Sequence, residues 1–595
     1  MRFVLPLLIL PFVLAAQTPT ISYKLGMSKP WTHLFEVELT YSNLPAKKNT
    51  LDLALPAWRS GRYLIFDLAG NVIEFTAVDA ADRQLPWAKV DKSTWRIEKK
   101  GATTVKARYT VFSNDFRARK NGLNDEHAFV NGAAVFMYAE QYRRVPVSLR
   151  VLPYDGWRVS TGLESIQGDP YHFSAMSYDH LLDCPLEVGN QKEYEFDVDG
   201  VKHVLSIFGE GNFRPDSLTR DIGRIVKAQK EFWGGLPYKR YVFLVHVSPQ
   251  SAGATEYLNS TVLGTRPFIF HNFGSYRGFL GLVSHEFFHA WNVKRLRPKG
   301  MHPYDYAKEN YAKEYWIAEG MTSYFSAFMM IRAGLASGSS YAENLANLIQ
   351  EDRQRPGNKV QSLSESSFDA WIKQWKQGDH AYNTQSDYYG KGSIVSLLLD
   401  LEIRQQSKNK HSLGDVLRAM YSRFPITGAG YTIDDFQKVA EEFAGASLRE
   451  FFADYVHGTK PLDWERFLSY AGLDVMVRNS ERRPWTGFST VDQDETTRIT
   501  RVVAGSPAYE AGIDIGDEVV ALNGYRVRTY DLLERIGMLQ PGDKVKILVF
   551  REDRIREFTV TLQLQTVPPY RVNKTENPTK LQKEIYESWL MTSWE

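Results

Sequence analysis

The run His285-Glu286-Phe287-Phe288-His289 holds the residues whose types and spacing best fit a chemical role. Histidines four positions apart lie on one face of a helix, about one turn from each other, so both imidazoles can reach one Zn²⁺. Glu286, beside the first histidine, can then take the proton of a water molecule that the metal activates. This spacing predicts a zinc site with a glutamate as its general base.

A catalytic zinc site needs a third protein ligand if it is to keep a fourth position open. The sequence favours Glu319, because it stands in the mainly apolar run Tyr315–Met321, where a carboxylate needs a cation. Glu309 and Glu314 also follow His289 and precede this run. We interpret these two glutamates as solvated helix charges.

The segment Phe279–Val293 is predicted to be a buried helix, since it has no proline and its apolar positions suit a core. Two histidines and a glutamate inside such a helix would be costly to bury without a partner. A metal ion would satisfy all three. Histidines on an exposed amphipathic helix are the alternative, and they fit poorly with Phe287, Phe288 and Trp291 packed beside them.

The composition of the whole chain excludes several classes of protein. Its 595 residues are too many for one ordinary core, so three or four domains are expected. The 72 basic and 70 acidic residues nearly balance, which argues against a nucleic-acid partner. Cys184 is the only cysteine, so no internal disulfide can form.

Residues 1–16 have the pattern of a cleavable signal peptide, with Arg2, an apolar run from Phe3 to Leu14, and small residues up to Ala16. A short membrane anchor is the alternative, but about 12 apolar residues fall short of the roughly 20 that span a bilayer. We therefore expect an exported protein, periplasmic or secreted, with no membrane span after signal cleavage.

Residues 17–205 read as a β-rich N-terminal domain, most simply a β-sandwich. Apolar and polar residues alternate in Phe35–Tyr41 and in Val105–Val111, the period of half-buried strands. Asn131-Gly132 and Asp199-Gly200 predict hairpin turns, because these residues accept a positive φ.

Residues 206–480 read as a mainly helical domain. An apolar stripe from Leu218 to Phe232 predicts a helix that ends at Gly234, and Tyr241–Val245 predicts a buried strand. His246, at the end of that strand, is interpreted as structural. Thr432 begins a predicted capping box.

Residues 481–566 read as a small separate domain of short strands and glycine turns, followed by a tail at 567–595. In the tail, Leu581, Ile585 and Trp589 share one face of a short predicted helix. That helix is expected to pack onto the body of the protein, since an exposed tryptophan and leucine would be unfavourable in water.

The run His285–Pro298 is similar to the extended zinc signature of the glycyl aminopeptidase family of PDZ-containing zinc metallopeptidases, and Trp316–Gly320 matches at the family's spacing. The resemblance implies a multidomain α+β protein: a β-sandwich-like N-terminal domain, a thermolysin-like, mainly helical catalytic domain and a C-terminal PDZ domain. It also implies one catalytic Zn²⁺, held by His285, His289 and Glu319, with Glu286 as general base.

Two further motifs resemble elements of related aminopeptidases. Tyr389-Gly390-Lys391-Gly392 resembles a Tyr-x-Lys-Gly element whose tyrosine donates to the oxyanion; the adjacent Tyr388 is the competing assignment. Gly253-Ala254-Thr255-Glu256 resembles an edge-strand Gly-x-x-Glu motif that binds substrate, in which the glutamate binds the free α-amino group and the strand pairs with the peptide. Ala254, Thr255 and Tyr257 depart from the family's more usual Gly-Gly-Leu-Glu-His. These departures put the preference around the first substrate residue in doubt, and not the mechanism.

The stretch from Thr500 to Gly524 resembles a bacterial PDZ domain. Trp485-Thr486-Gly487-Phe488 would then form the loop whose backbone N–H groups accept a peptide C-terminus. A docking module with an idle groove is an equal alternative, because Trp485-Thr486 replaces a common Gly-Leu pair.

These observations lead us to expect an exported zinc aminopeptidase acting on peptides with a free N-terminus, with Gly or Ala as possible first residues. A thermolysin-like endopeptidase is the first alternative, although a buried amine-binding Glu256 would disfavour internal peptide segments. A PDZ scaffold with little activity is the second. The presence of all the expected ligands, the base and a candidate oxyanion tyrosine argues against it.

Overall fold

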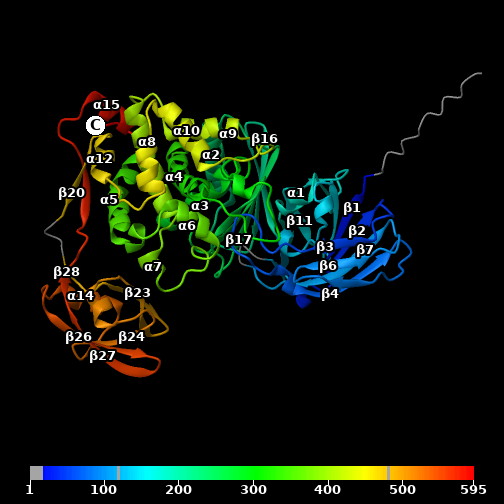
Figure 1. Ribbon diagram of the computed structural model, residues 1–595, viewed down its shortest axis with the longest axis horizontal. Helices are drawn as coiled ribbons and strands as arrows, with labels where there is room; N and C mark the ends of the chain where they lie inside the picture. The colour runs from blue at the N-terminus through cyan, green and yellow to red at the C-terminus, as the bar shows by residue number, and fades with distance from the viewer. Residues whose placement is uncertain (1–17, 117–120, 479–482) are drawn as a thin grey trace, which may run out of the picture. The chain divides into compact units, whose positions relative to one another are not determined.

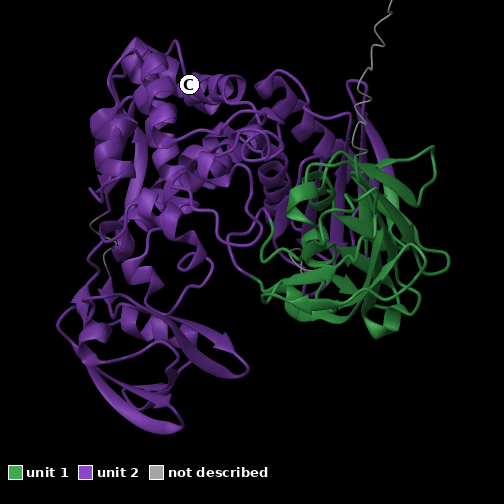
Figure 2. Ribbon diagram, turned by 45° about the vertical axis from the view of Figure 1, so that its right-hand side comes forward, with its two compact units in different colours: residues 1–59, 66–193, 206–208 green, residues 60–65, 194–205, 209–595 purple. Residues whose placement is uncertain are grey.

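A computed structural model of the chain describes residues 18–116, 121–478 and 483–595, so the predicted signal peptide lies outside the described residues. The chain divides into two compact units (Figure 2). Unit 1 comprises residues 1–59, 66–193 and 206–208, and unit 2 comprises 60–65, 194–205 and 209–595. Two segments of the range predicted as the N-terminal domain, 60–65 and 194–205, therefore group with unit 2.

Unit 1 is built from sheets whose strands are mostly antiparallel, with β1 and β10 as a parallel pair, in agreement with the predicted β-rich domain. Phe35–Tyr41 and Val105–Val111 lie in strands that pair with each other, and their alternate residues are buried as the pattern predicted. The largest sheet has the order β12 (Glu164–Ser165), β13 (His172–Ala175), β10 (Val147–Leu152), β1 (Thr20–Gly26), β2 (Leu34–Ser42), β7 (Val105–Phe112), β4 (Val72–Asp79). The second has the order β11 (Arg158–Thr161), β14 (Leu186–Gly189), β9 (His127–Val130), β8 (Gly122–Leu123), and the third β3 (Thr50–Ala54), β6 (Thr94–Glu98), β5 (Trp87–Lys89).

One of the two predicted hairpins forms and the other does not. Asp199 and Gly200, with φ of 51° and 85°, connect the neighbouring strands β15 (Lys192–Val198) and β16 (Val201–Phe208). The hairpin predicted at Asn131-Gly132 is wrong. Asn131 has a φ of −86°, and its side chain accepts a hydrogen bond from the Ala133 N–H, so it caps a short 3₁₀ turn after β9.

The sheet nearest the candidate site has the order β15, β16, β17 (Arg240–Val247), β19 (Ser260–Thr265), β18 (Ala254–Glu256). Strand β17 contains the predicted strand Tyr241–Val245 and runs parallel to β19 in the core. Strand β18 pairs antiparallel to β19 and forms the edge of this sheet. Glu256 therefore stands on an edge strand.

Helices fill the rest of the middle region of unit 2 (Figure 1). The apolar stripe from Leu218 lies on α2, which ends at Gly234 in the left-handed conformation, as predicted. The Thr432 capping box is present, although Asp435 serves in place of the usual glutamate. The main helices are α2 (Pro215–Trp233), α3 (Phe273–Phe288), α4 (Met321–Arg332), α5 (Gly338–Gln354), α8 (Gly390–Gln406), α9 (Leu413–Arg423), α10 (Ile433–Ala444), α12 (Trp464–Ser469) and α15 (Lys580–Leu590).

The C-terminal helix α15 packs as predicted from its apolar face. Ile585 and Trp589 are buried, and the Trp589 indole N–H donates to the Tyr324 hydroxyl of α4 at 3.1 Å. The tail thus packs against helices of unit 2. Among the described residues, no helix combines the length and the apolar character needed to cross a bilayer.

The PDZ-like region has its own apolar core, which includes Ile499, Leu532, Val545 and Val560. Gly512 and Gly516 adopt positive φ at the predicted turns. The sheet has the order β22 (Phe488–Gln493), β23 (Thr496–Val502), β24 (Glu518–Leu522), β26 (Lys544–Arg551), β27 (Arg554–Thr561), with α13 (Pro507–Ala511) and α14 (Thr529–Gly537) beside it. Two short pairs flank this region, β20 (Leu473–Val477) with β29 (Tyr570–Lys574) and β21 (Pro484–Trp485) with β28 (Gln563–Leu564).

Candidate active site

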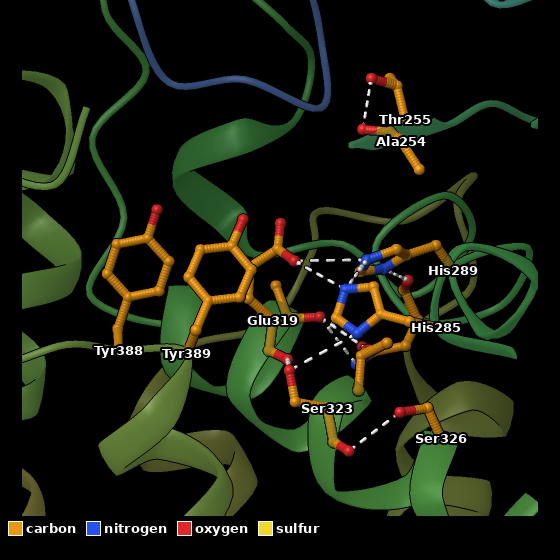
Figure 3. Close-up of polar contacts among 12 residues, drawn as sticks. Ala254, Thr255, His285, His289, Glu319, Ser323, Ser326, Tyr388 and Tyr389 are labelled. Carbon is orange, nitrogen blue, oxygen red and sulfur yellow. Dashed lines mark hydrogen bonds and ion pairs between the residues drawn. The ribbon is translucent and has the colours of Figure 1, made fainter. Parts of the chain in front are cut away.

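The two histidines and Glu319 come together as the sequence predicted. The Nε2 atoms of His285 and His289 lie 3.1 Å apart. Oε2 of Glu319 lies 3.5 Å from the first of these atoms and 3.3 Å from the second. Figure 3 shows this carboxylate between the histidine pair and two tyrosines.

These three atoms fit the corners of a zinc site. A tetrahedral ion with bonds of about 2.0–2.1 Å holds its ligand atoms roughly 3.3–3.4 Å apart. The observed separations of 3.1, 3.5 and 3.3 Å span that value. Two imidazoles and one carboxylate also form a donor set that zinc accepts in catalytic sites. The residues present therefore fit the metal.

Each histidine ring is oriented through its other nitrogen. Nδ1 of His289 donates to the backbone carbonyl of Asn292 at 3.0 Å, and Nδ1 of His285 lies 3.5 Å from the Ser323 hydroxyl. A donor role for Nδ1 leaves Nε2 with the lone pair that a metal needs. The environment of both rings thus favours the tautomer that binds metal.

The zinc-motif helix ends earlier than predicted, and the reason lies at Asn292. Helix α3 stops at Phe288, with His289 at its C-cap in a helical conformation, whereas the prediction extended to Val293. The Asn292 amide donates to the carbonyl of Ile317 at 2.9 Å and to the Thr322 hydroxyl at 2.9 Å. Asn292 therefore ties the end of the motif to the segment that carries Glu319, a role that the sequence reasoning missed.

Glu319 stands in a turn of π-helix, Trp316–Gly320, that leads into α4. Such turns occur often at functional sites. Gly320 lies so close to the start of α8 that a Cβ there would come within 2.5 Å of the Tyr388 carbonyl oxygen and 2.6 Å of the Gly392 Cα. Gly320 and Gly392 therefore let the Glu319 turn approach the start of α8 closely.

Electrostatics within the cluster follow from burial and opposite charge. Burial disfavours the charged form of His289, but the negative charge of Glu319, with Glu256 and Glu286 nearby, raises its pKa to about 9. Burial would raise the pKa of Glu319, yet both histidines together hold it below its ordinary value. Burial outweighs the Glu319 carboxylate at His285, whose pKa is lowered. Without metal, the cluster is an ion pair in which Glu319 is ionised.

Glu286 and Glu256 lie next to this cluster. One carboxylate oxygen from each, together with a ring nitrogen of His289, fall within 4.8 Å of one another. Both glutamates are buried, Glu286 on α3 and Glu256 on the edge strand β18. Gly253 precedes this strand with a φ of 78°, and its carbonyl accepts from the Gly264 N–H at 2.8 Å.

The two candidate tyrosines differ in their surroundings. Tyr388 is buried, and its hydroxyl accepts a hydrogen bond from the Trp375 indole N–H at 3.0 Å. Tyr389 is half-buried, and its ring centroid lies 6.4 Å from that of His285. A cavity of about 570 Å³ lies beside Tyr389 and is also lined by Ser323, Asn358 and Lys391. Tyr389 is thus the tyrosine that faces both the metal cluster and open space.

Glu309 and Glu314, the two other glutamates near the motif, both lie outside helices. Glu314 is buried rather than solvated, and its carboxylate accepts from the Ile433 N–H at 3.1 Å. It precedes the π-helical turn and supports the start of α10, so it takes no part in the metal cluster. Our interpretation of Glu309 and Glu314 as solvated helix charges is therefore wrong.

The PDZ residues form a tight turn into the strand β22. Gly487 has a φ of 88°, and a Cβ there would lie 2.0 Å from the Ser506 Cβ. The carbonyls of Thr486 and Gly487 accept from the N–H groups of Ala508 and Val503, both at 2.8 Å. Strand β22, which begins at Phe488 after Trp485, stands at the edge of its sheet, and α14 packs near it.

Comparison with known proteins identifies three regions. Residues 22–190 match the model of the Peptidase M61 N-terminal domain, residues 278–395 match the M61 glycyl aminopeptidase model, and residues 484–562 match the PDZ domain model. The second range contains both histidines of the cluster, Glu319 and Tyr389.

The chain is also similar to a solved structure and to curated proteins. The chain is similar to an aminopeptidase N family protein from Idiomarina loihiensis, with 28% identity and a TM-score of 0.89 over 95% of this chain and 100% of that one. It is also similar to the periplasmic pH-dependent serine endoprotease DegQ of Escherichia coli, 35% identical over 69 residues. That match covers 11% of this chain and 15% of the relative, so the chain shares only a small part of that relative's length.

Proposed function

Because the chain carries the N-terminal and catalytic domains of the M61 glycyl aminopeptidase family together with a PDZ domain, we propose that it is a zinc-dependent aminopeptidase. The observation that supports this proposal best is the position of Glu256. Its carboxylate lies within 4.8 Å of ligand atoms of Glu286 and His289, so an amine bound there stands next to the catalytic groups. Only one residue then fits between the anchored amine and the bond that is cut.

The roles of the side chains follow from their places. When bound, zinc polarises the scissile carbonyl and makes a water molecule more acidic. Glu286 takes the proton of the attacking water and passes it to the leaving amine. The Tyr389 hydroxyl donates a hydrogen bond to the carbonyl oxygen as negative charge develops there. This bond stabilises the transition state by about 3 kcal/mol. The cavity beside Tyr389 offers room for residues that follow the cleaved bond.

Substrate recognition is proposed to depend on β18. As the last strand of its sheet, β18 gives the direction in which a bound peptide would run, while Glu256 binds the free α-amino group. Burial strengthens this selection, because a substrate without an amine leaves the Glu256 carboxylate buried opposite an uncharged group. Glycine and alanine are the first residues that we propose as preferred; the family's description names the glycyl residue.

Hydrolysis of a small panel of substrates tests the proposal. Glycyl, alanyl and leucyl chromogenic amides, the same amides with acetylated amines, and an internally quenched peptide would be compared with the zinc-loaded enzyme and its Glu286→Gln variant. We expect cleavage of the free-amine amides only, and none by the variant. Cleavage of the quenched peptide between internal residues, with acetylated amides accepted, would instead indicate an endopeptidase. No turnover of any substrate with zinc bound would favour the scaffold alternative.

For the PDZ domain we propose capture of peptide C-termini at Trp485–Phe488. Edge strand β22 gives the peptide a strand to pair with, and both β22 and α14 carry an exposed apolar side chain, Val491 and Leu533. Binding of a C-terminal peptide library to the full chain, compared with amidated copies of the same peptides, tests this. Equal binding of both forms would refute carboxylate capture and leave a docking role.

We also propose that the protein is exported, on the basis of residues 1–16. Expression with these residues, followed by mass measurement of the mature chain, would show whether cleavage occurs after Ala16. A chain that keeps residues 1–16 would contradict the proposal.

A further inference from the structure

Six residues far from the zinc motif in sequence belong to the catalytic unit. Ser60–Ile65 are flanked on both sides by chain of unit 1, yet they group with unit 2 (Figure 2). Two of these residues, Gly61 and Tyr63, lie against Glu256 and Glu319 of the candidate site, and we call this segment the Tyr63 loop. No motif in the sequence marked it.

Tyr63 contacts the side of Glu319 that faces away from the histidines. Its hydroxyl donates to Oε1 of Glu319 at 3.1 Å, whereas Oε2 is the oxygen that lies 3.3 Å and 3.5 Å from the two imidazole nitrogens. The two oxygens of one carboxylate are therefore divided between the tyrosine and the metal position. This division favours binding of the metal through a single oxygen.

The Tyr63 ring is held firmly enough to direct that hydrogen bond. Its side chain is fully buried and stacks on Tyr315 with ring centroids 3.9 Å apart. The edge of Trp371 packs against it at 6.0 Å. The Tyr315 hydroxyl and the Trp371 indole N–H both donate to the carbonyl of Asn310, at 2.5 Å and 3.3 Å. Neighbours that are themselves hydrogen-bonded thus fix the ring.

The same loop covers the second buried carboxylate. Gly61 has a φ of 82°, and a Cβ there would lie 2.7 Å from Oε2 and 3.0 Å from Oε1 of Glu256. Glycine is therefore required for this close approach as well as for the backbone conformation. The neighbouring Ser60 hydroxyl accepts from the Lys294 ammonium at 3.0 Å, which anchors the loop just beyond the zinc motif.

We propose that Tyr63 is a positioning residue for the zinc ligand Glu319, and that Gly61 in the same loop sets the position of Glu256. The proposal rests on the zinc site and the amine-binding role proposed above. A hydrogen bond to the non-ligating oxygen holds a carboxylate in the orientation that the metal needs, and such outer contacts typically change metal affinity or activity by about 10–100-fold. One loop would then align the metal end and the amine end of the site.

The variant Tyr63→Phe tests the first half, because it removes one hydroxyl and keeps the buried ring. The measurements are the rate at which zinc passes to a chelator and the rise in Tm when zinc is added to the metal-free protein. We expect zinc to be lost about 10–100-fold faster, with a smaller rise in Tm when zinc is added, whatever the change in the metal-free Tm.

Tyr324→Phe is the matched control, since Tyr324 is also buried and donates to a buried carboxylate, Asp400, at 2.7 Å. It should lower the Tm of the metal-free and zinc-loaded forms equally and leave zinc release unchanged. Zinc release from Tyr63→Phe at the wild-type rate would overturn the positioning role. This readout does not depend on which peptide is cleaved, so it stands even if the proposed aminopeptidase activity fails.

The variant Gly61→Ala tests the second half, with Gly101→Ala as its control. Both glycines have a φ of 82°, but a Cβ at Gly101 meets nothing within 4 Å, so only the first variant reaches a carboxylate. We expect Gly61→Ala to raise KM for free-amine substrates about 10–100-fold with zinc retained, since small misplacements carry effects of that size. A KM equal to that of the control, with both variants folded, would refute the role of Gly61.

Discussion

Two buried glutamates of the site, Glu319 and Glu256, have the same side chain and opposite surroundings. Glu319 is 2% exposed and stands among helices, where two histidines and Tyr63 contact its oxygens. Glu256 is 4% exposed and stands on an edge strand, with Gly61 packed against its carboxylate. The first is contacted by side chains of the catalytic cluster, whereas the second lies on the last strand of a sheet, where we propose that the substrate amine binds.

This difference teaches how one residue type serves two purposes. A carboxylate that binds a resident metal ion must stand, with the other metal-binding side chains, on rigid elements. Here those elements are α3 and the Trp316–Gly320 turn. A carboxylate that binds an incoming amine needs access for the ligand and low dielectric around it. The account therefore predicts separable defects at the two ends of the site.

The largest effect is expected at the metal end. Glu319→Gln removes the charge of a ligand, so we expect loss of bound zinc and a fall in kcat/KM of roughly 10⁴-fold or more, the scale of metal-ion catalysis. Metal analysis and kinetics measure both. Glu314→Gln is the control, because Glu314 is a buried carboxylate outside the cluster, and this variant should keep its zinc. A zinc-replete, active Glu319→Gln enzyme would remove Glu319 from the ligand set.

Glu286→Gln should separate chemistry from metal binding. The amide cannot accept a proton, so we expect kcat to fall about 10²–10⁴-fold, the usual contribution of a general base, while zinc content stays at the wild-type level. Steady-state kinetics on a glycyl amide and metal analysis of the same sample check this. A variant that keeps its kcat would assign the base elsewhere, and Glu256 would become the first candidate because it lies in the same group.

Tyr389→Phe should lower kcat about 10²–10³-fold, the range for loss of one oxyanion donor, with KM little changed. Tyr388→Phe is its control, since that hydroxyl already accepts from Trp375. Removing it should cost about 1–3 kcal/mol of stability through the unpaired indole N–H, which thermal unfolding would reveal. If Tyr388→Phe lowers kcat and Tyr389→Phe does not, then Tyr388 is the oxyanion donor.

The smallest effect, and the most selective one, is expected at the amine end. Glu256→Gln replaces a charged acceptor with a neutral one, so we expect KM for free-amine amides to rise about 10–100-fold, the equivalent of 1.5–3 kcal/mol for a charged hydrogen bond. Zinc content should not change. An equal rise in KM for every substrate, or loss of bound zinc, would mean that Glu256 and Glu319 do not have separate roles.

Features encoded locally in the sequence could be predicted. His285 and His289 fall on one helical face because of their spacing, and the apolar residues around Glu319 distinguished it from Glu309 and Glu314. Alternation identified strands β2 and β7, and turn residues identified the Asp199-Gly200 hairpin.

The features that escaped prediction depend on contacts between distant residues. Tyr63 and Glu319 are 256 positions apart, so nothing in either neighbourhood signals their hydrogen bond. Helix α3 ends at Phe288, where Asn292 makes hydrogen bonds to the Glu319 segment. The sequence pattern, which does not contain those bonds, predicted a longer helix. The Asn131 side chain likewise accepts a hydrogen bond from the Ala133 N–H, so the chain forms a 3₁₀ turn there instead of a hairpin.

The most direct test of the central claim is product analysis by mass spectrometry. The zinc-loaded enzyme would be incubated with a glycine-led peptide of defined sequence and with its N-acetylated copy. The account predicts products shortened from the N-terminus one residue at a time for the free peptide, and an intact acetylated peptide. Internal fragments from both peptides would contradict an amine anchor at Glu256 and identify the enzyme as an endopeptidase.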